Sequence, residues 1–378
     1  MKINAPVPTG EYAVGTFTYT IKNHRQEVME PAKMRSIACR VYYPVLKNSV
    51  ENLPKTRYIS PRIAQGIKKS FGIAPNFWKL EKSGQNTSEC YENAPRIPGQ
   101  KFPLIVFNHG SNSFREANSF LCIDLASHGY VIISVAHSRE AVCAEFDEET
   151  DDGSFVFCDK SLAKKIYNPF WRGVFAALKI TKAKGTNEEL ARKFDAFQNK
   201  YCSFLQSRLD EWVKDVDASV DYAKKNLSDL IDFEKGIGAT GHSFGGNVAY
   251  RLCANNPDYV CGTNLDGAYF GDYQNTVMTK SFLQVSGKDN ENVVTRVYTN
   301  HTKTVYKVLF RDMKHFGFSD MKFLLPAKSM AGKLPAQELH ENLCRCHLEF
   351  FDAFLKKTKP APELKSNDAV TVTEFPAN

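Results

Sequence analysis

One hexapeptide in this sequence places a serine among glycines in the spacing of a nucleophilic turn. It reads Gly-His-Ser-Phe-Gly-Gly and covers residues 241–246. An apolar run precedes it and a helical pattern, 247–254, follows, so Ser243 is expected at a tight strand–turn–helix junction with its hydroxyl exposed. Because the helix begins at once, its unpaired N–H groups point at whatever the serine attacks. The turn therefore suits nucleophilic attack on a carbonyl carbon.

A serine hydroxyl needs a base that removes its proton during the attack, and histidine has a pKa suited to this task. The chain has 9 histidines. His242 lies inside the serine turn, so its ring is expected to point elsewhere. His315 follows the last predicted strand, 304–310. The other histidines lie in loops near early strands or on surface-like and helical stretches, so His315 is the predicted base.

Two aspartates are candidates for the carboxylate that fixes the tautomer of the histidine. Asp266 ends the strand that follows the serine, predicted over 259–265. Asp289 follows the next strand, 281–286, in a Gly-Lys-Asp-Asn sequence that also reads as an ordinary turn. The residues alone leave both open.

The oxyanion that forms during the attack needs two main-chain N–H donors. We expect one from Phe244, directly after the nucleophile, and one from Ser111, in the loop after a buried strand over 102–108. Aromatic residues near the candidate catalytic positions are expected to line the substrate pocket. These residues are Phe244, Tyr269, Phe270, Phe316 and Phe318.

The segments that must hold these side chains alternate between strands and helices. Two Tyr-, Thr- and Val-rich segments, 12–21 and 36–45, predict antiparallel strands at the edge of a sheet. Six further strands alternate with helices or excursions, as in a parallel sheet. The chain order Ser, Asp, His is that of the α/β-hydrolase fold. The sequence therefore predicts an α/β fold with a mostly parallel eight-stranded sheet and helices on both faces.

No internal repeat and no linker divides the 378 residues. We expect a single domain over 1–357, with insertions near 50–100 and 137–200. An acidic run at 147–152 is expected to be a solvated loop. Residues 358–378, rich in Pro, Lys, Asn and Thr, are expected to form a loosely ordered tail.

Composition excludes several classes of protein. The net charge of +7 comes without a Lys/Arg ladder, so no nucleic-acid partner is expected. No apolar run is long enough for a transmembrane helix, and no apolar core follows the first residues, so a cytoplasmic location is expected. The 10 cysteines are scattered, with one close pair, Cys344 and Cys346. They read as reduced core thiols, so neither a metal nor a cofactor is expected.

A helix pattern over 61–71 leaves two interpretations open. Its apolar stripe either packs on the core or, with neighbouring lysines and aromatic residues, forms an interfacial face over 60–80 that touches a membrane. The residues of this face are Ile63, Ile67, Phe71, Phe77 and Trp78. The oligomeric state is left open.

Several strings resemble the platelet-activating-factor acetylhydrolase family, the calcium-independent phospholipases A2 of the α/β-hydrolase superfamily. The most discriminating is Asp-Leu-Ala-Ser-His-Gly at 124–129, together with the spacing from serine to aspartate. The resemblance spans about 8–355. The strings are Pro8-Thr9-Gly10 with Tyr12 and Val14-Gly15, Asn108-His109-Gly110, Ile123 to Gly129, Gly241 to Gly246, Leu265-Asp266-Gly267, and His315.

The resemblance implies a catalytic triad of Ser243, Asp266 and His315, with Phe244 and Ser111 as oxyanion donors. It also implies a serine esterase that removes short or oxidised acyl chains from phospholipids through an acyl-enzyme. Two alternatives are a general short-chain carboxylesterase and a non-catalytic binding protein on the same scaffold. The presence of serine, base and acid disfavours the binding protein.

Overall fold

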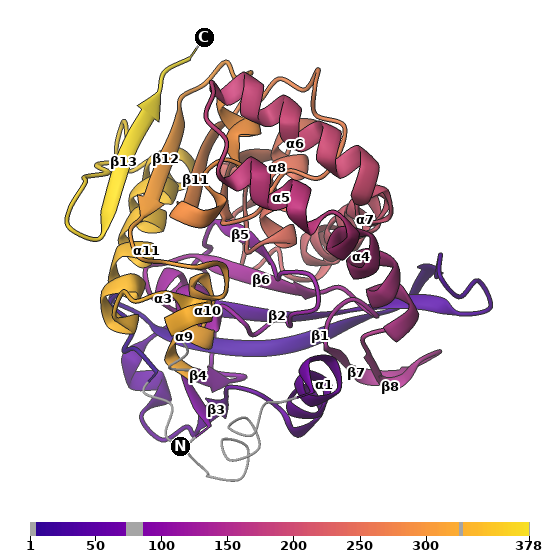
Figure 1. Cartoon of the computed structure of the whole chain (residues 1–378). Coiled ribbons are helices and arrows are strands. Elements are labelled where there is room, and N and C mark those ends of the chain that lie inside the picture. Colours follow the sequence, from indigo (N-terminus) through magenta and orange to yellow (C-terminus); the bar gives the residue numbers. More distant parts are fainter. Residues whose placement is uncertain (1–4, 73–85, 325–327, 378) are drawn as a thin grey trace. The chain divides into compact units, whose positions relative to one another are not determined.

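The computed structural model describes residues 5–72, 86–324 and 328–377 (Figure 1). The chain divides into two compact units. The described residues form thirteen strands, where the sequence predicts eight. Unit 1 takes its described residues from 1–162, 215–236 and 323–325, and unit 2 takes them from 163–214, 237–322 and 326–378. The organisation as one domain over 1–357 stays a prediction.

The strands of unit 1 follow the order β3-β4-β1-β2-β6-β5, with both parallel and antiparallel pairs. β1 and β2 pair antiparallel, as predicted. Their predicted place at the sheet edge is wrong, because β4 pairs with the other side of β1 and β3 continues beyond it. β4 escaped prediction because its sequence, Thr-Ser-Glu-Cys-Tyr-Glu, is short and polar. The strands are β1 (Ala13–Gln26), β2 (Met34–Val45), β3 (Lys55–Arg57), β4 (Thr87–Glu92), β5 (Leu104–Asn108) and β6 (Val131–Ala136).

Helix α1 (Pro61–Phe71) shows which of its apolar residues pack on the core and which could belong to a membrane face over 60–80. The hydroxyl of Ser60 accepts from the N–H of Ile63 and caps the helix, which then begins with a proline. Ile63 and Ile67 are buried and Phe71 is half exposed. The two isoleucines are therefore core residues, not part of a membrane face. Phe77 and Trp78 lie outside the described residues.

The acidic run belongs to a hairpin of β7 (Cys143–Thr150) and β8 (Gly153–Phe157), so its prediction as a loop is wrong over most of its length. Two of its carboxylates accept hydrogen bonds from side chains of β1. Asp147 accepts from the hydroxyl of Thr18 at 2.6 Å, and Asp151 accepts from the side chain of Asn23 at 2.9 Å. These bonds tie the hairpin to β1, which a charge pattern alone does not reveal. Unit 1 also holds α3 (Ser119–Ser127) and the short turns Lys47–Val50 and Phe233–Lys235.

The strands of unit 2 follow the order β9-β10-β11-β12-β13, and Figure 1 shows β11, β12 and β13 side by side. The first four strands are parallel, and β13 pairs antiparallel with β12. The predicted loose tail is therefore wrong, because Val370 and its neighbours alternate apolar and polar residues and continue the sheet. The strands are β9 (Ile237–Gly241), β10 (Tyr259–Leu265), β11 (Ser281–Gly287), β12 (Val305–Phe310) and β13 (Val370–Phe375).

The helices of unit 2 follow its strands or precede them in an excursion of the chain. α8 starts directly after β9, and α7 continues from unit 2 into unit 1. In the described part of the chain no helix is long and apolar enough to cross a membrane. The helices are α4 (Lys160–Arg172), α5 (Val174–Thr181), α6 (Asn187–Tyr201), α7 (Ser203–Asn226), α8 (Phe244–Asn255), α9 (Met321–Leu324), α10 (Lys328–Ala331) and α11 (Ala336–Phe351), with a π-turn at Asp352–Lys356 and short turns at Lys288–Asn290, Thr295–Tyr298 and His315–Phe318.

Parallel strands bring their carboxyl ends to one edge of a sheet, where ligands bind in open α/β folds. The loops after β9, β10 and β12 carry Ser243, Asp266 and His315. All three lie in unit 2, so the strands of one unit suffice to bring them together.

Candidate active site

Ser243 occupies a strained backbone position between β9 and α8. Its φ is 58° and its ψ is −124°, in a region that residues with a side chain seldom adopt. Its N–H donates to the carbonyl of Leu265 at 2.8 Å, which ties the turn to β10. A side chain at Gly246 would meet the amide of Asn264, and one at Gly267 would meet the carbonyl of Ser243. The turn is therefore as tight as the sequence predicts.

The side chains of Ser243, His315 and Asp266 form a continuous hydrogen-bonded line. Nε2 of His315 lies 2.9 Å from Oγ of Ser243, and Nδ1 of the same ring lies 2.7 Å from Oδ2 of Asp266. With Nδ1 carrying a proton for the carboxylate, Nε2 is left to accept the proton of the serine. The arrangement can activate the hydroxyl for attack on an ester.

Asp266 is held by donors from the neighbouring loop. Its side chain is 1% exposed. The main-chain N–H of Gly287 donates to Oδ1 at 2.8 Å, and the amide of Asn290 donates to Oδ2 at 2.6 Å. Asp289, the other candidate acid, is 65% exposed and pairs with Lys314 at 3.1 Å. The structure brings Asp266 to the histidine and leaves Asp289 at the surface.

Asn290 is a residue that the sequence analysis missed. Besides bonding Asp266, its amide nitrogen lies 3.3 Å from Nδ1 of His315. It follows Asp289 directly in the Gly-Lys-Asp-Asn sequence, which by itself indicates only a turn. Asn290 positions the carboxylate that in turn positions the imidazole.

His242 also contacts the candidate base. Its ring lies beside that of His315, with centroids 4.9 Å apart and planes inclined by 33°, and its Nε2 is 3.0 Å from the main-chain oxygen of His315. Burial lowers the pKa of His242 to about 3, and His315 adds to the shift. His242 is therefore neutral at physiological pH and donates from Nε2 to that carbonyl.

The two predicted oxyanion donors lie in different units. Phe244 is the first residue of α8, so its N–H has no partner within the helix. Ser111 lies in unit 1, in the loop after β5, where the N–H of Asn112 donates to Glu140 at 3.0 Å. The ring of His109 supports this loop with a 2.7 Å contact to the carbonyl of Gly110. The role of Ser111 stays a prediction.

The predicted pocket residues divide into two groups. Tyr269 is buried against Tyr250, and its hydroxyl donates to Gln284. Phe318 is buried against Phe310. The structure thus places Tyr269 and Phe318 among core aromatic residues, because both side chains are buried against other rings.

The other three predicted pocket residues lie around the serine and histidine. Phe244 packs against Trp212 and, at a centroid distance of 6.3 Å, against half-buried Phe270. Phe316 is 40% exposed beside the ring of His315. The role of Phe244, Phe270 and Phe316 as pocket walls stays a prediction.

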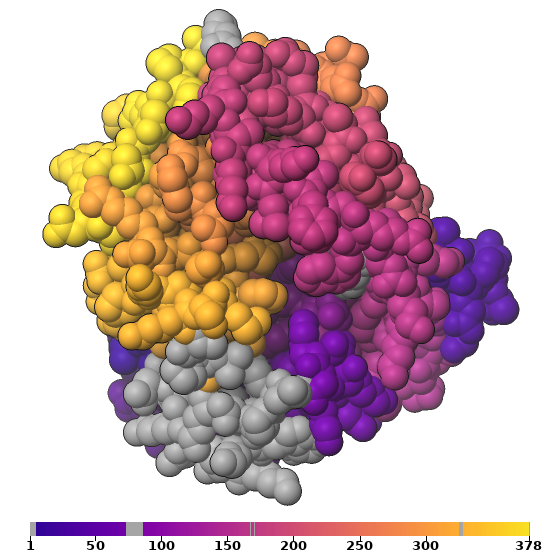
Figure 2. Space-filling view, in the orientation of Figure 1, coloured from indigo at the N-terminus to yellow at the C-terminus, as the bar shows by residue number. Residues whose placement is uncertain are grey.

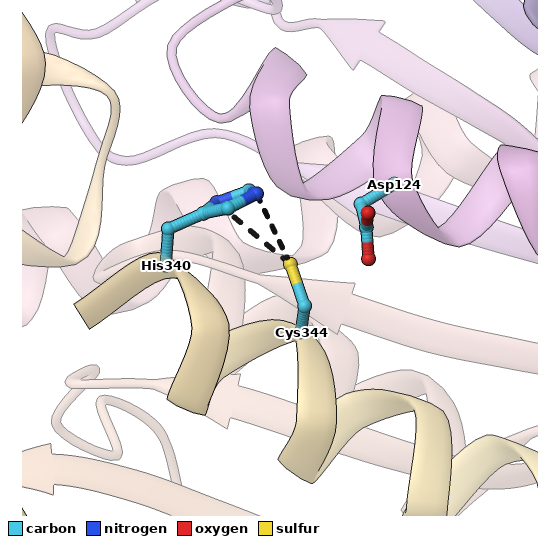
Figure 3. A group of neighbouring side chains, drawn as sticks. All are labelled: Asp124, His340 and Cys344. Carbon is cyan, nitrogen blue, oxygen red and sulfur yellow. Dashed lines mark hydrogen bonds between the residues drawn. The ribbon is translucent and has the colours of Figure 1, made fainter. Parts of the chain in front are cut away.

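The cysteine pair noted in the sequence does not act as a pair. Cys344 contacts His340 one turn earlier on α11, with Sγ 3.4 Å from Nε2 (Figure 3). Figure 3 also draws Asp124 of α3, which belongs to unit 1. Residues two apart on a helix point in different directions, so Cys346 cannot join the Cys344 contact. The expectation that the protein needs no metal stays a prediction.

Comparison with solved structures supports the fold. The chain is similar to a ferulic acid esterase from Streptomyces cinnamoneus, with a TM-score of 0.72, 20% sequence identity and 98% of each chain covered. At this identity the likeness concerns the fold alone, and it confirms the predicted α/β-hydrolase architecture.

Comparison with curated proteins gives a consistent set of relatives. The chain is 29% identical over 280 residues to platelet-activating factor acetylhydrolase of Canis lupus familiaris, an alignment that covers 69% of this chain and 54% of the dog protein. It is 23% identical over 401 residues to the enzyme of that name from Cavia porcellus, covering 98% of this chain and 83% of the relative. The alignment thus spans about half the length of the dog protein.

The match to a protein family covers most of the chain. Residues 1–358 match the family described as platelet-activating factor acetylhydrolase, isoform II. This range includes the serine turn, the aspartate after β10 and the histidine after β12. The chain therefore belongs to the platelet-activating factor acetylhydrolase family.

Proposed function

We propose that this protein is a serine ester hydrolase that removes short or oxidised acyl chains from phospholipids through an acyl-enzyme. The observation that carries the proposal is the line from Ser243 through His315 to Asp266, with bonds of 2.9 and 2.7 Å. Membership of the family supports the choice of a phospholipid ester over other esters.

In the first step, Oγ of Ser243 attacks the ester carbonyl while Nε2 of His315 takes the hydroxyl proton. The buried carboxylate of Asp266 stabilises the imidazolium that forms. The N–H of Phe244, at the start of α8, receives the oxyanion, and the sequence predicts the N–H of Ser111 as the second donor. His315 then gives its proton to the leaving alcohol, which departs and leaves the acyl group on Ser243.

In the second step, a water molecule takes the place of the alcohol. His315 accepts a proton from the water as its oxygen attacks the acyl-enzyme, and the same proton returns to Oγ of Ser243 as the bond breaks. The products are a carboxylic acid and the regenerated serine. The side chain of His315 is 35% exposed, which leaves the ring accessible from outside.

Two further features belong to the proposal. A cytoplasmic location is supported by the cysteines, all of which lie in the described ranges and none of which forms a disulfide. Contact with lipid at a membrane surface is supported by the substrate class. Because Ile63 and Ile67 are buried, a face over 60–80 is a poor basis for such contact.

The test is a series of nitrophenyl esters from acetyl to dodecanoyl, beside phospholipids that differ only in the second acyl chain, with calcium chelated. A closed wall penalises each methylene that does not fit by about 1–3 kcal/mol, so we expect activity to fall steeply beyond short chains. We also expect it to persist without calcium.

Activity on soluble esters with none on phospholipids, or a preference for long chains, would replace the proposal with a general carboxylesterase. Absence of all hydrolysis would leave a binding protein.

A further inference from the structure

The helical excursion before β9 carries most of the net charge of the chain. Residues 163–187 contain six cationic side chains and no acidic one, while the whole chain has a net charge of +7. All of these residues lie in unit 2, which also holds Ser243, Asp266 and His315. The cations are Lys164, Lys165, Arg172, Lys179, Lys182 and Lys184.

The same excursion exposes large apolar side chains. Trp171 is 64% exposed, Phe175 77% and Leu178 48%. The main chain stays helical through Gly173, whose N–H donates to Pro169 and whose carbonyl accepts from Ala177. Positions 171, 175 and 178 therefore share one face, and position 182 continues it. Figure 2 shows this segment, in magenta, at the surface of the visible face.

Cations surround this apolar face. Lys164, Arg172 and Lys179 fall beside it at helical spacing, and all three are exposed. Lys164, Lys165 and Arg172 also line an open hollow of about 340 Å³, together with Asn168, Pro169 and Phe204. A hollow lined by three cations and by apolar side chains suits a phosphate headgroup joined to hydrocarbon.

The opposite face of the segment packs toward the candidate active site. Ile180 is buried in a cluster with Phe194 and Phe197, and Phe270 packs against it. Phe270 in turn contacts Phe244, next to Ser243. The excursion thus presents one face outward and rests the other on a predicted wall of the acyl pocket.

We propose that the exposed face of α4 and α5, formed by Trp171, Phe175 and Leu178 with the surrounding cations, docks on the surface of an anionic phospholipid bilayer. Aromatic and aliphatic side chains flanked by lysines are the composition of helices that lie in the membrane interface. A second copy of the chain is a poor occupant, because two such faces would oppose like charges. The inference deepens the proposed function and rests on it for the link to hydrolysis.

The test measures binding of the full chain to vesicles, in a Ser243→Ala background that leaves the lipid intact. We expect binding to phosphatidylcholine vesicles that contain phosphatidylglycerol, and weaker binding to phosphatidylcholine alone or at high salt. Trp171→Ala with Phe175→Ala should lower the water-to-vesicle partition coefficient by roughly tenfold or more. The reason is that the variant has lost two large apolar side chains that the bilayer would bury. Lys179→Gln with Lys182→Gln should lower it by about fivefold per charge.

The matched control is Phe71→Ala, which removes an aromatic side chain of similar exposure from α1. We expect it to bind as the parent does. Equal loss with Phe71→Ala, unchanged binding after the Trp171 and Phe175 substitutions, or no binding of the parent to any vesicle would each overturn the proposal. Loss of self-association in the double variant would assign the face to a second copy instead.

Hydrolysis of a soluble ester separates this inference from the proposed function. In the active chain, Trp171→Ala with Phe175→Ala should leave soluble-ester turnover and thermal stability unchanged, because both side chains are largely exposed. A fall in either would make the face structural and contradict the inference. If the unmodified chain hydrolyses no ester, the proposed function fails while vesicle binding still decides the docking face.

Discussion

Two neighbouring loops of unit 2, after β10 and after β11, each present an aspartate just beyond a parallel strand. In the loop after β10, Asp266 is buried and accepts a hydrogen bond at each of its carboxylate oxygens. The loop after β11 leaves Asp289 in solvent beside Lys314. Yet the second loop also supplies Gly287 and Asn290, which hold the first carboxylate. The two loops therefore act together: one carries the aspartate that bonds the imidazole, and the other carries the donors that hold this aspartate.

The difference shows what makes a carboxylate suited to orienting a histidine. Burial without donors would favour the protonated acid, whereas convergent N–H groups keep a buried carboxylate charged. An exposed ion pair such as that of Asp289 adds little to stability or orientation, because water and salt screen it. Both aspartates follow a strand, but only Asp266 has the hydrogen bonds that let a carboxylate orient the histidine.

The largest effect in this comparison should come from Asp266→Asn. An amide at this position favours the wrong imidazole tautomer, so turnover should fall by about 10⁴, as in serine proteases. Steady-state hydrolysis of a soluble nitrophenyl ester measures the change, with circular dichroism to confirm the fold. A loss of less than tenfold would remove Asp266 from the triad.

A smaller effect is expected from Asn290→Ala, which removes one of the donors to the carboxylate. A hydrogen bond to a charged group contributes about 1.5–3 kcal/mol, so turnover should fall roughly 10- to 100-fold. Asn300→Ala is the control, since that amide donates to a main-chain carbonyl outside the site. Equal effects of the two variants would deny Asn290 a positioning role.

Much of this comparison could be predicted from the sequence. Ser243 and His315 were identified because the turn and the chain order constrain them, and the apolar runs indicated β9 to β12. Asn290 was missed because its partner comes from a different strand, and sequence order does not show which side chains converge in space. β13 was missed for a related reason. Its short alternation of apolar and polar residues becomes a strand by pairing with β12, and this pairing is not visible in the sequence.

Burial also separates two histidines. His315 is partly exposed, whereas His347 is buried on α11, donates to the carbonyl of Leu343 at 2.8 Å, and has a pKa lowered by burial to about 4. The unfolded chain therefore binds more protons between pH 4 and 6.5, so stability is full above pH 6.5 and falls as the pH drops. From pH 7 to 5 the wild type should lose about 2 kcal/mol more free energy of unfolding than His347→Gln.

Urea unfolding at several pH values measures this difference. Identical pH profiles for wild type and His347→Gln would show that His347 does not stay neutral in the fold.

The smallest effect should come from Asp289→Asn. It removes one exposed ion pair, whose contribution is typically about 0–1 kcal/mol, so soluble-ester turnover should change by roughly threefold at most. The same assay as for Asp266→Asn applies. A loss comparable to that of Asp266→Asn would reverse the assignment of the two loops.

Labelling of the full chain with a fluorophosphonate, followed by mass spectrometry of the peptides, tests most directly whether His315 activates Ser243 as a nucleophile. We expect one adduct, on Ser243, with none in Ser243→Ala and slow labelling in His315→Ala and Asp266→Asn. An unlabelled folded wild type, or an adduct on another residue that persists in Ser243→Ala, would contradict this expectation.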